Sequence, residues 1–297
     1  MTRDDGFVYD DGVVGRMAPD RYHVTTTTGG APRVLSHMED YLQTEWTDLN
    51  VWLTSTTEQW AVIAVQGPHA RDVLTPLVEG IDISRDGMPH MSVKQGHICG
   101  VPTRFFRMSF TGETGFEVNV PAAYGRGVWD AIHAEVVKYD GCAYGTEAMH
   151  VLRAEKGYII VGQDTDGTLT PDEAGVGWAV GKTKVDFVGK RGLMRPDLLK
   201  PNRKQVVGLL TVDPAVVLEE GAQITEMAEP AIGEHAIGHV TSAYWSSNLG
   251  RSIALCNLEG GRARYGQEVY VPMPGGSIPV TVVDPVFIDK EGMRLNG

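Results

Sequence analysis

The sequence predicts an α+β region followed by a small all-β domain, on three observations. Up to about residue 200, runs of β-branched and apolar residues alternate with stretches whose apolar residues recur at helical spacing. From Gln205 onward, short β-rich runs are separated by Gly, Pro and Asn turns. The short basic stretch 200–204 lies between the two patterns, so we expect domains at 1–200 and 201–297.

Strands and helices are expected to alternate through the first region. Runs rich in Val, Thr and aromatic residues predict strands at 7–17, 21–28, 60–66, 103–110 and 115–120. Apolar residues three and four positions apart predict helices at 31–44, from Pro68 into residues 70–78, at 122–139 and at 147–158. In the second region, strands are expected at 206–212, 236–245, 252–258, 268–273 and 277–288. Short strands of this kind are typical of a barrel or a sandwich.

Composition narrows the class of protein. With 297 residues, of which 42% are hydrophobic, the chain predicts a soluble globular protein. A net charge of −12 without a long basic tract argues against nucleic acid as the main partner. The first residues, MTRDDGFVYDDG, contain no apolar leader, and no apolar run is long enough to span a bilayer, so we expect a cytoplasmic protein without a membrane partner. Three scattered Cys residues predict reduced thiols and no metal site.

Motifs of several common enzyme classes are missing. The chain has no G-x-G-x-x-G after a strand, no Walker loop, no G-x-S-x-G and no H-E-x-x-H. Dehydrogenase, NTPase and hydrolase interpretations therefore lose their usual support, and we expect no flavin or NAD on this segment. The nine His residues are dispersed singly, so we assign a catalytic role to none of them.

Three carboxylates in apolar surroundings each allow two interpretations. Asp10 and Asp11 lie between FVY and VV, where a turn pair that accepts local N–H groups is the simpler one. Glu117 alternates with apolar residues and can face water on an outer sheet face. If these carboxylates instead turn into one pocket, they could grip the N–H groups of a polar heterocycle, with a raised proton affinity suited to proton transfer. The residues alone leave both open.

Seven stretches appear in an order that resembles the folate-binding aminomethyltransferase family, which includes the T-protein of the glycine cleavage system. They are VYDDGVVGRM, AVIAVQGPHARDVL, FTGETGFEVNV, LRAEKGYIIVGQDTD, GWAVGKTKVDFVGKR, GHVTSAYWSSNLGRSIAL and PVTVVDPVFI. YHVTTTTGGA and YGTEAMHVLRAEKGYIIVGQDTDGT resemble more closely the C-terminal half of the α subunit of heterotetrameric sarcosine oxidases. The resemblance implies two intertwined folate-binding subdomains, the first truncated at its N-terminus, and then a small β-barrel domain.

The same resemblance implies roles for six residues. Asp11 matches the second Asp of the family's DD pair, placed beside N10 of tetrahydrofolate as acid, base or electrostatic partner. Glu117 would hold the pterin by paired hydrogen bonds to its N–H groups. Phe110 would stack on the pterin, where relatives often carry Tyr. The further residues matched to folate binding are Arg153, Tyr244 and Trp245, the last two with barrel core as the equal alternative.

The implied activity is tetrahydrofolate-dependent one-carbon transfer in sarcosine oxidation. A methylene or iminium unit made at a flavin in another subunit would be trapped as 5,10-methylenetetrahydrofolate, which implies β, γ and δ oxidase subunits as partners. Two alternatives stay open: a stand-alone aminomethyltransferase of the glycine cleavage type, and a catalytically silent folate-binding or scaffold fragment. Against the first, Met149 stands where glycine-cleavage members have a folate-binding Arg.

Overall fold

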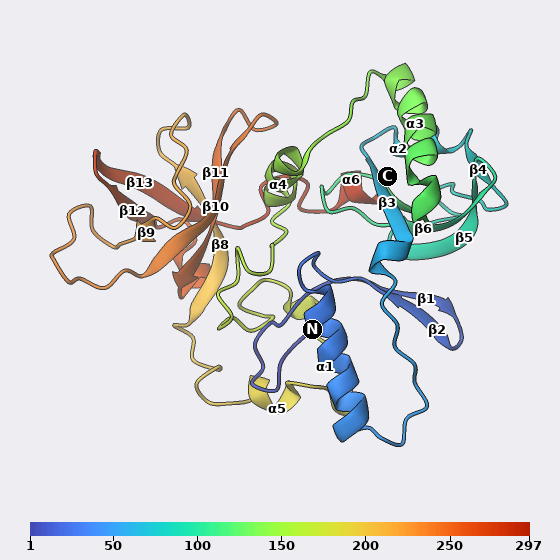
Figure 1. The fold of residues 1–297 in the computed structure, drawn as a ribbon. Coiled ribbons are helices and arrows are strands. Elements are labelled where there is room, and N and C mark those ends of the chain that lie inside the picture. Colours follow the sequence, from blue (N-terminus) through green and yellow to red (C-terminus); the bar gives the residue numbers. More distant parts are fainter. The chain divides into compact units, whose positions relative to one another are not determined.

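The computed structural model describes residues 1–297, and its contacts divide the chain into two compact units (Figure 1). Unit 1 comprises Met1–Tyr9 and Thr146–Lys290, and unit 2 comprises Asp10–Gly145 and Glu291–Gly297. Each unit thus combines segments that are distant in sequence. The domain limit that composition suggests at residues 200–201 lies inside unit 1 and stays a proposal for the border between sequence domains.

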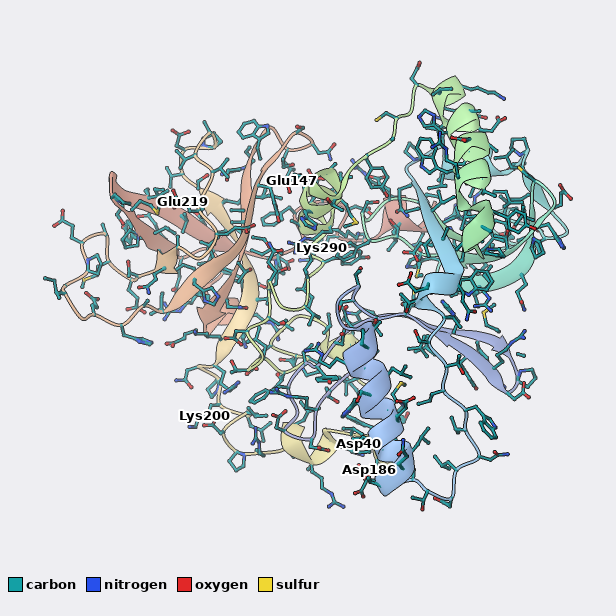
Figure 2. All side chains as sticks on the ribbon, viewed as in Figure 1. Asp40, Glu147, Asp186, Lys200, Glu219 and Lys290 are labelled. Atoms are coloured by element: carbon teal, nitrogen blue, oxygen red, sulfur yellow. The ribbon has the colours of Figure 1, made fainter.

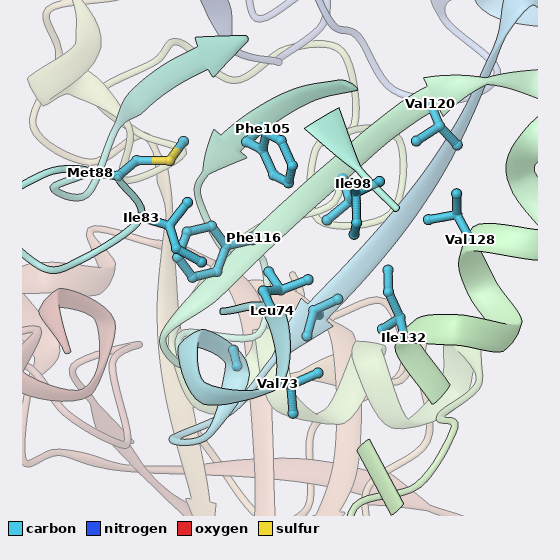
Figure 3. Close-up of a cluster of buried hydrophobic side chains, with 13 residues drawn as sticks. Val73, Leu74, Ile83, Met88, Ile98, Phe105, Phe116, Val120, Val128 and Ile132 are labelled. Carbon is cyan, nitrogen blue, oxygen red and sulfur yellow. The ribbon is translucent and has the colours of Figure 1, made fainter. Parts of the chain in front are cut away.

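A five-stranded antiparallel sheet forms the centre of unit 2, in the order β3-β7-β6-β5-β4. Its strands are β3 (Trp60–Gln66), β4 (Val78–Glu79), β5 (Ser92–Ile98), β6 (Val101–Arg107) and β7 (Gly115–Pro121). Helices α2 (Ala70–Leu74) and α3 (Gly125–Val136) supply apolar side chains to one face of this sheet (Figure 3). Leu74, Phe116 and Ile132 meet in this core, where each buried side chain contributes about 1.5–3 kcal/mol.

The opposite face of the same sheet carries a short hairpin of β1 (Val14–Ala18) and β2 (Arg21–Val24). The side chain of Phe106 in β6 points to this face, because its neighbour Phe105 lies in the core and successive strand residues point to opposite faces. A Cβ atom at Gly15 would lie 2.6 Å from the Phe106 ring, so only glycine lets β1 approach this closely. Helix α1 (Ala31–Thr44) follows the hairpin.

Unit 1 contains a six-stranded sheet in the order β12-β13-β8-β11-β10-β9. Its strands are β8 (Lys204–Thr211), β9 (Gln223–Ile224), β10 (Gly238–Ser246), β11 (Arg251–Glu259), β12 (Glu268–Met273) and β13 (Gly276–Val283). Just after β9, Thr225 exchanges two backbone hydrogen bonds of 2.9 Å with Tyr270 of β12. The sheet therefore closes into a barrel, and apolar side chains such as Val207, Val240 and Val280 form its core.

Helix α4 (Thr146–Glu155) packs against this barrel from outside. Its Ala154 and Val151 contact Tyr244 and Leu255, which form a cluster separate from the barrel core. The irregular segment between α4 and β8 includes α5 (Lys190–Leu193) and contributes to a third small cluster with Val8. The last helix, α6 (Met293–Asn296), belongs to unit 2.

Most of the expected elements are confirmed, and the differences have local causes. Helix α1 has the predicted limits, and the second region is a barrel rather than a sandwich. The strand expected at 7–17 starts only at Val14, because the side chain of Asp10 accepts backbone N–H groups and turns the chain before it. Strand β5 was not expected, since SVKQGHI is largely polar and shows no clear apolar alternation.

Charged side chains cover the surfaces of both units. Asp40, Glu147, Asp186, Lys200, Glu219 and Lys290 are examples, and all six are exposed (Figure 2). No helix in the chain combines the length and the apolar character that crossing a membrane requires.

Candidate functional site

Glu117 lies on the sheet face that is turned away from the apolar core of unit 2. Its neighbours Phe116 and Val118 are fully buried in that core, and successive strand residues point to opposite faces. In the register of the sheet, Ala64 of β3 lies on one side of Glu117 and Phe106 of β6 on the other. Because Ala64 is exposed, Glu117 borders an open apolar stretch of the sheet.

The carboxylate of Glu117 has no hydrogen-bond or ion-pair partner in the protein. The amide of Asn119 donates to the backbone carbonyl of Glu117 at 3.2 Å, and not to its side chain. Burial raises the pKa of Glu117. A desolvated carboxylate without donors is unfavourable, and such groups gather at sites where a ligand supplies the missing donors. Glu117 therefore marks a candidate ligand site.

Tyr144, which follows α3, lies within electrostatic reach of this carboxylate. Burial, and then the charge of Glu117, raise the pKa of Tyr144. Nothing in the sequence around Tyr144 pointed to this proximity, because 27 residues separate it from Glu117 (144 − 117). Tyr144 is therefore a polar residue in the neighbourhood of Glu117.

The connection between β6 and β7, residues 108–114, is held in place by Gln66 at the end of β3. Gln66 Oε1 accepts hydrogen bonds from the hydroxyls of Ser109 (2.5 Å) and Thr111 (3.0 Å). A Cβ at Gly115 would lie 2.4 Å from the same oxygen, so a larger residue there would have to displace the Gln66 side chain. Phe110 is half-buried within the connection. Phe110 and Glu117 thus flank one well-anchored turn, and Gln66 is a positioning residue that the sequence did not reveal.

The neighbouring carboxylates Asp10 and Asp11 are in different situations. Asp10 is fully buried, accepts the backbone N–H groups of Asp11 (2.8 Å) and Thr27 (3.0 Å), and forms an ion pair with Arg33 (3.3 Å). These contacts of Asp10 hold the turn before α1. Asp11 has no ion-pair partner, and burial, followed by the charge of Asp10, raises its pKa. Only Asp11 has a carboxylate available for a ligand.

Asp11 leads into the hairpin that lies on the same sheet face as Glu117. The ring of His23 in β2 lies 5.4 Å from that of Phe106, the residue directly opposite Glu117 in the register. The guanidinium of Arg104 hydrogen-bonds to His23 at 3.1 Å and stacks on Trp60 at 3.9 Å. These contacts place the hairpin and Glu117 on one side of the sheet.

Arg153, Tyr244 and Trp245 belong to unit 1. Arg153 is fully buried, forms an ion pair with the equally buried Asp164, and donates to the Ser242 hydroxyl at 2.7 Å. Its guanidinium also lies 5.9 Å from the centre of the Tyr244 ring. Trp245 is 45% exposed because it points to the other face of β10. With no exposed surface, Arg153 can serve a ligand only through its neighbours.

We expect Arg153→Met to lower the free energy of unfolding by about 3–5 kcal/mol, because Asp164 would be left as a buried charge without its cation. Thermal and urea unfolding measure the loss. Lys200→Met, which removes an exposed ion pair with Asp197, is the control and should leave the midpoint unchanged. A loss below about 1 kcal/mol would contradict the structural role of the pair.

We expect Glu117→Gln to raise the melting temperature of the ligand-free chain at pH 7. The folded-state pKa of Glu117 is raised above its unfolded value of 4.5, so its contribution to stability is present below that value and lost as pH rises through the folded pKa. The difference between wild type and variant should close as the pH approaches 4.5. Differential scanning fluorimetry tests this, with the exposed Glu147→Gln as control. A variant that melts at or below wild type at pH 7 would contradict the desolvation argument.

Two family models match the chain. The model described as "GCVT N-terminal domain" matches residues 1–184, and the model described as "Glycine cleavage T-protein C-terminal barrel domain" matches residues 204–289. The second match covers the six-stranded barrel of unit 1.

Curated relatives match the chain over nearly its whole length. Sarcosine oxidase subunit alpha from Corynebacterium sp. strain P-1 is 46% identical, and the match covers 100% of this chain and 31% of the relative. The same subunit from Rhizobium meliloti is 39% identical, and the match covers 100% of this chain and 30% of the relative. The chain thus spans about a third of the length of these subunits. An aminomethyltransferase from Thermotoga sp. strain RQ2 is 31% identical over 95% of this chain and 73% of its own length.

The fold is also that of a solved structure. The glycine cleavage system aminomethyltransferase T from Bartonella henselae superposes with a TM-score of 0.81 at 21% identity, covering 98% of this chain and 75% of the other. The family models and the Thermotoga relative lead to the same conclusion. The chain belongs to the glycine cleavage T-protein family of aminomethyltransferases.

Proposed function

We propose that unit 2 binds tetrahydrofolate and that the chain takes part in folate-dependent one-carbon transfer. The observation that carries the proposal is the desolvated carboxylate of Glu117, which has no donor within the protein. A pterin presents an amino group and a ring N–H side by side, and a carboxylate can accept both in a paired, charge-assisted arrangement. The Glu117 carboxylate therefore suits the polar edge of a pterin.

The surroundings of Glu117 also suit a flat heterocycle. Ala64 is exposed beside it, and Val62, two residues earlier on the same face of β3, is 54% exposed. These small apolar side chains would form the floor for a pterin ring, and Phe110 would provide an aromatic face. The anchoring of residues 108–114 by Gln66 would keep Phe110 and Glu117 at a constant separation.

Asp11 is the proposed catalytic residue. Bound tetrahydrofolate would supply the chemistry of one-carbon acceptance at its N5 and N10 atoms. Asp11 would take up and return one proton beside N10, since its raised pKa makes it a better proton acceptor than an ordinary aspartate. The protein's other tasks are to orient the pterin and to exclude water that would release the one-carbon unit as formaldehyde.

We further propose that the one-carbon unit comes from sarcosine oxidation and is recovered as 5,10-methylenetetrahydrofolate. Support comes from three sarcosine oxidase α subunits that match the whole chain at 39–46% identity. Because the chain spans only about a third of those subunits, flavin-bearing oxidase subunits enter as proposed partners.

A stand-alone aminomethyltransferase is the second candidate. The Thermotoga enzyme, of which 73% is covered, favours it. Against it stands Met149 on α4, where the glycine-cleavage members of the family carry an Arg. A catalytically silent folate-binding fragment is the third reading, and it predicts binding without turnover.

Titration calorimetry with 5-formyltetrahydrofolate tests the binding proposal. We expect the wild type to bind and Glu117→Ala to lose about 10–100-fold in affinity, the value of a charge-assisted pair of hydrogen bonds. Wild-type affinity should also fall as pH drops through the raised pKa of Glu117, because the protonated acid cannot accept both hydrogen bonds. Equal binding by both proteins would remove Glu117 from the site.

Asp11→Asn tests the catalytic assignment. In a complex reconstituted with flavin-bearing subunits, this variant should keep its affinity for 5-formyltetrahydrofolate but form 5,10-methylenetetrahydrofolate about 100-fold more slowly, releasing formaldehyde instead. Asp10 is unsuitable as a comparison because it is structural, so Asp130→Asn, at an exposed aspartate on α3 of the same unit, serves as the control. Unchanged product formation in Asp11→Asn would refute the role of Asp11.

A further inference from the structure

The C-terminal segment of the chain, residues 291–297, contacts the connection between β6 and β7. Thr114 donates its hydroxyl to the backbone carbonyl of Arg294 at 2.8 Å. The guanidinium of Arg107 donates to the carbonyl of Leu295 at 2.8 Å. A third contact is the ion pair of Arg294 with Glu113 at 3.1 Å. The segment is therefore bonded to the second half of the turn TGETG, residues 111–115, and to Arg107 before it.

Arg107 is the central residue of this contact. Its side chain is fully buried, and its second hydrogen bond, of 3.2 Å, goes to the carbonyl of Gly115, the first residue of β7. No carboxylate pairs with it. Burial, and then the nearby charge of Arg71, lower the pKa of Arg107 to about 10. Its guanidinium also lies 5.3 Å from the centre of the Phe116 ring, so its only hydrogen-bond acceptors are the two carbonyls. A buried cation depends strongly on each acceptor, so Arg107 connects Leu295 to Gly115.

The same turn is held on its other side by Gln66, through Ser109 and Thr111. The C-terminal segment contributes little to the fold of the sheet itself. None of its residues belongs to the core of unit 2, and Leu295 is its one buried apolar side chain. Its backbone carbonyls instead accept hydrogen bonds from Thr114 and Arg107. Thr114 lies between Phe110 and Glu117 in the sequence, and Arg107 also donates to Gly115 in the same stretch.

We propose that residues 291–297 are a positioning element of the folate pocket, which holds Thr114 and Gly115 so that Phe110 and Glu117 keep the spacing that a bound pterin requires. This inference rests on the proposed function of unit 2. It assigns a role in ligand recognition to Arg107, Thr114 and the last residues of the chain, none of which is proposed to touch the ligand.

The test compares Thr114→Val with Thr114→Ser in the full chain. Valine has the shape of threonine without the hydroxyl, so the bond to Arg294 is lost, whereas serine keeps it. We expect Thr114→Val to weaken 5-formyltetrahydrofolate binding about tenfold and Thr114→Ser to bind nearly as wild type. Thr75→Val removes a hydroxyl-to-carbonyl bond of the same 2.8 Å length elsewhere in unit 2 and should change the affinity by less than about twofold.

Hydrogen–deuterium exchange without ligand gives an independent readout. Amides of residues 108–114 should exchange faster in Thr114→Val than in wild type, while those of the β3 and β7 core stay protected. Unchanged exchange together with unchanged affinity in Thr114→Val would overturn the proposal, and so would an equal loss of affinity in Thr114→Ser. If the wild type itself binds no 5-formyltetrahydrofolate, the folate proposal fails and takes the recognition role with it, while the exchange measurement alone then decides whether the segment holds the turn.

Discussion

The desolvated carboxylate of Glu117 is the constraint from which the account of this protein follows. A strand that places Phe116 and Val118 in the core must place Glu117 on the opposite face, and the hairpin of β1 and β2 lies on part of that face. The carboxylate is partly withdrawn from water without receiving a donor from the protein. Such an arrangement costs stability in the free protein. It becomes favourable when a ligand brings two N–H groups to the carboxylate.

The rest of unit 2 can be understood as support for this one group. Ala64 beside it is small and exposed, and the missing side chain of Gly115 makes room for Gln66. Gln66 and Arg107 anchor the turn before it from two sides. Asp10 accepts local backbone N–H groups and pairs with Arg33, whereas its neighbour Asp11 has no ion-pair partner. Unit 1, in contrast, contains its own buried polar network, in which Asp164 pairs with Arg153 and accepts a hydrogen bond from Ser242.

The sequence predicted most of the fold but only part of the site. Periodicity located α1, β3, β7 and every barrel strand except the two-residue β9, because each buries one face and shows it in the apolar pattern. It left the two interpretations of Asp10 and Asp11 open, since the distinction depends on Thr27 and Arg33, which the fold brings to Asp10. The same reason explains why no role was predicted for Gln66, Arg107 and Tyr144: the fold brings them to groups that are distant in sequence. The burial of Arg153 against Ser242 could not be foreseen from the helix that carries it.

The most direct test of the central claim is to measure the pKa of the Glu117 carboxyl by carbon-13 NMR, with Glu117→Gln used to assign the resonance. In the free chain the pKa should lie above the ordinary value of 4.5. On saturation with 5-formyltetrahydrofolate it should fall, because donated hydrogen bonds stabilise the charged form. An ordinary pKa in the free chain that does not move when the ligand is added would contradict the account.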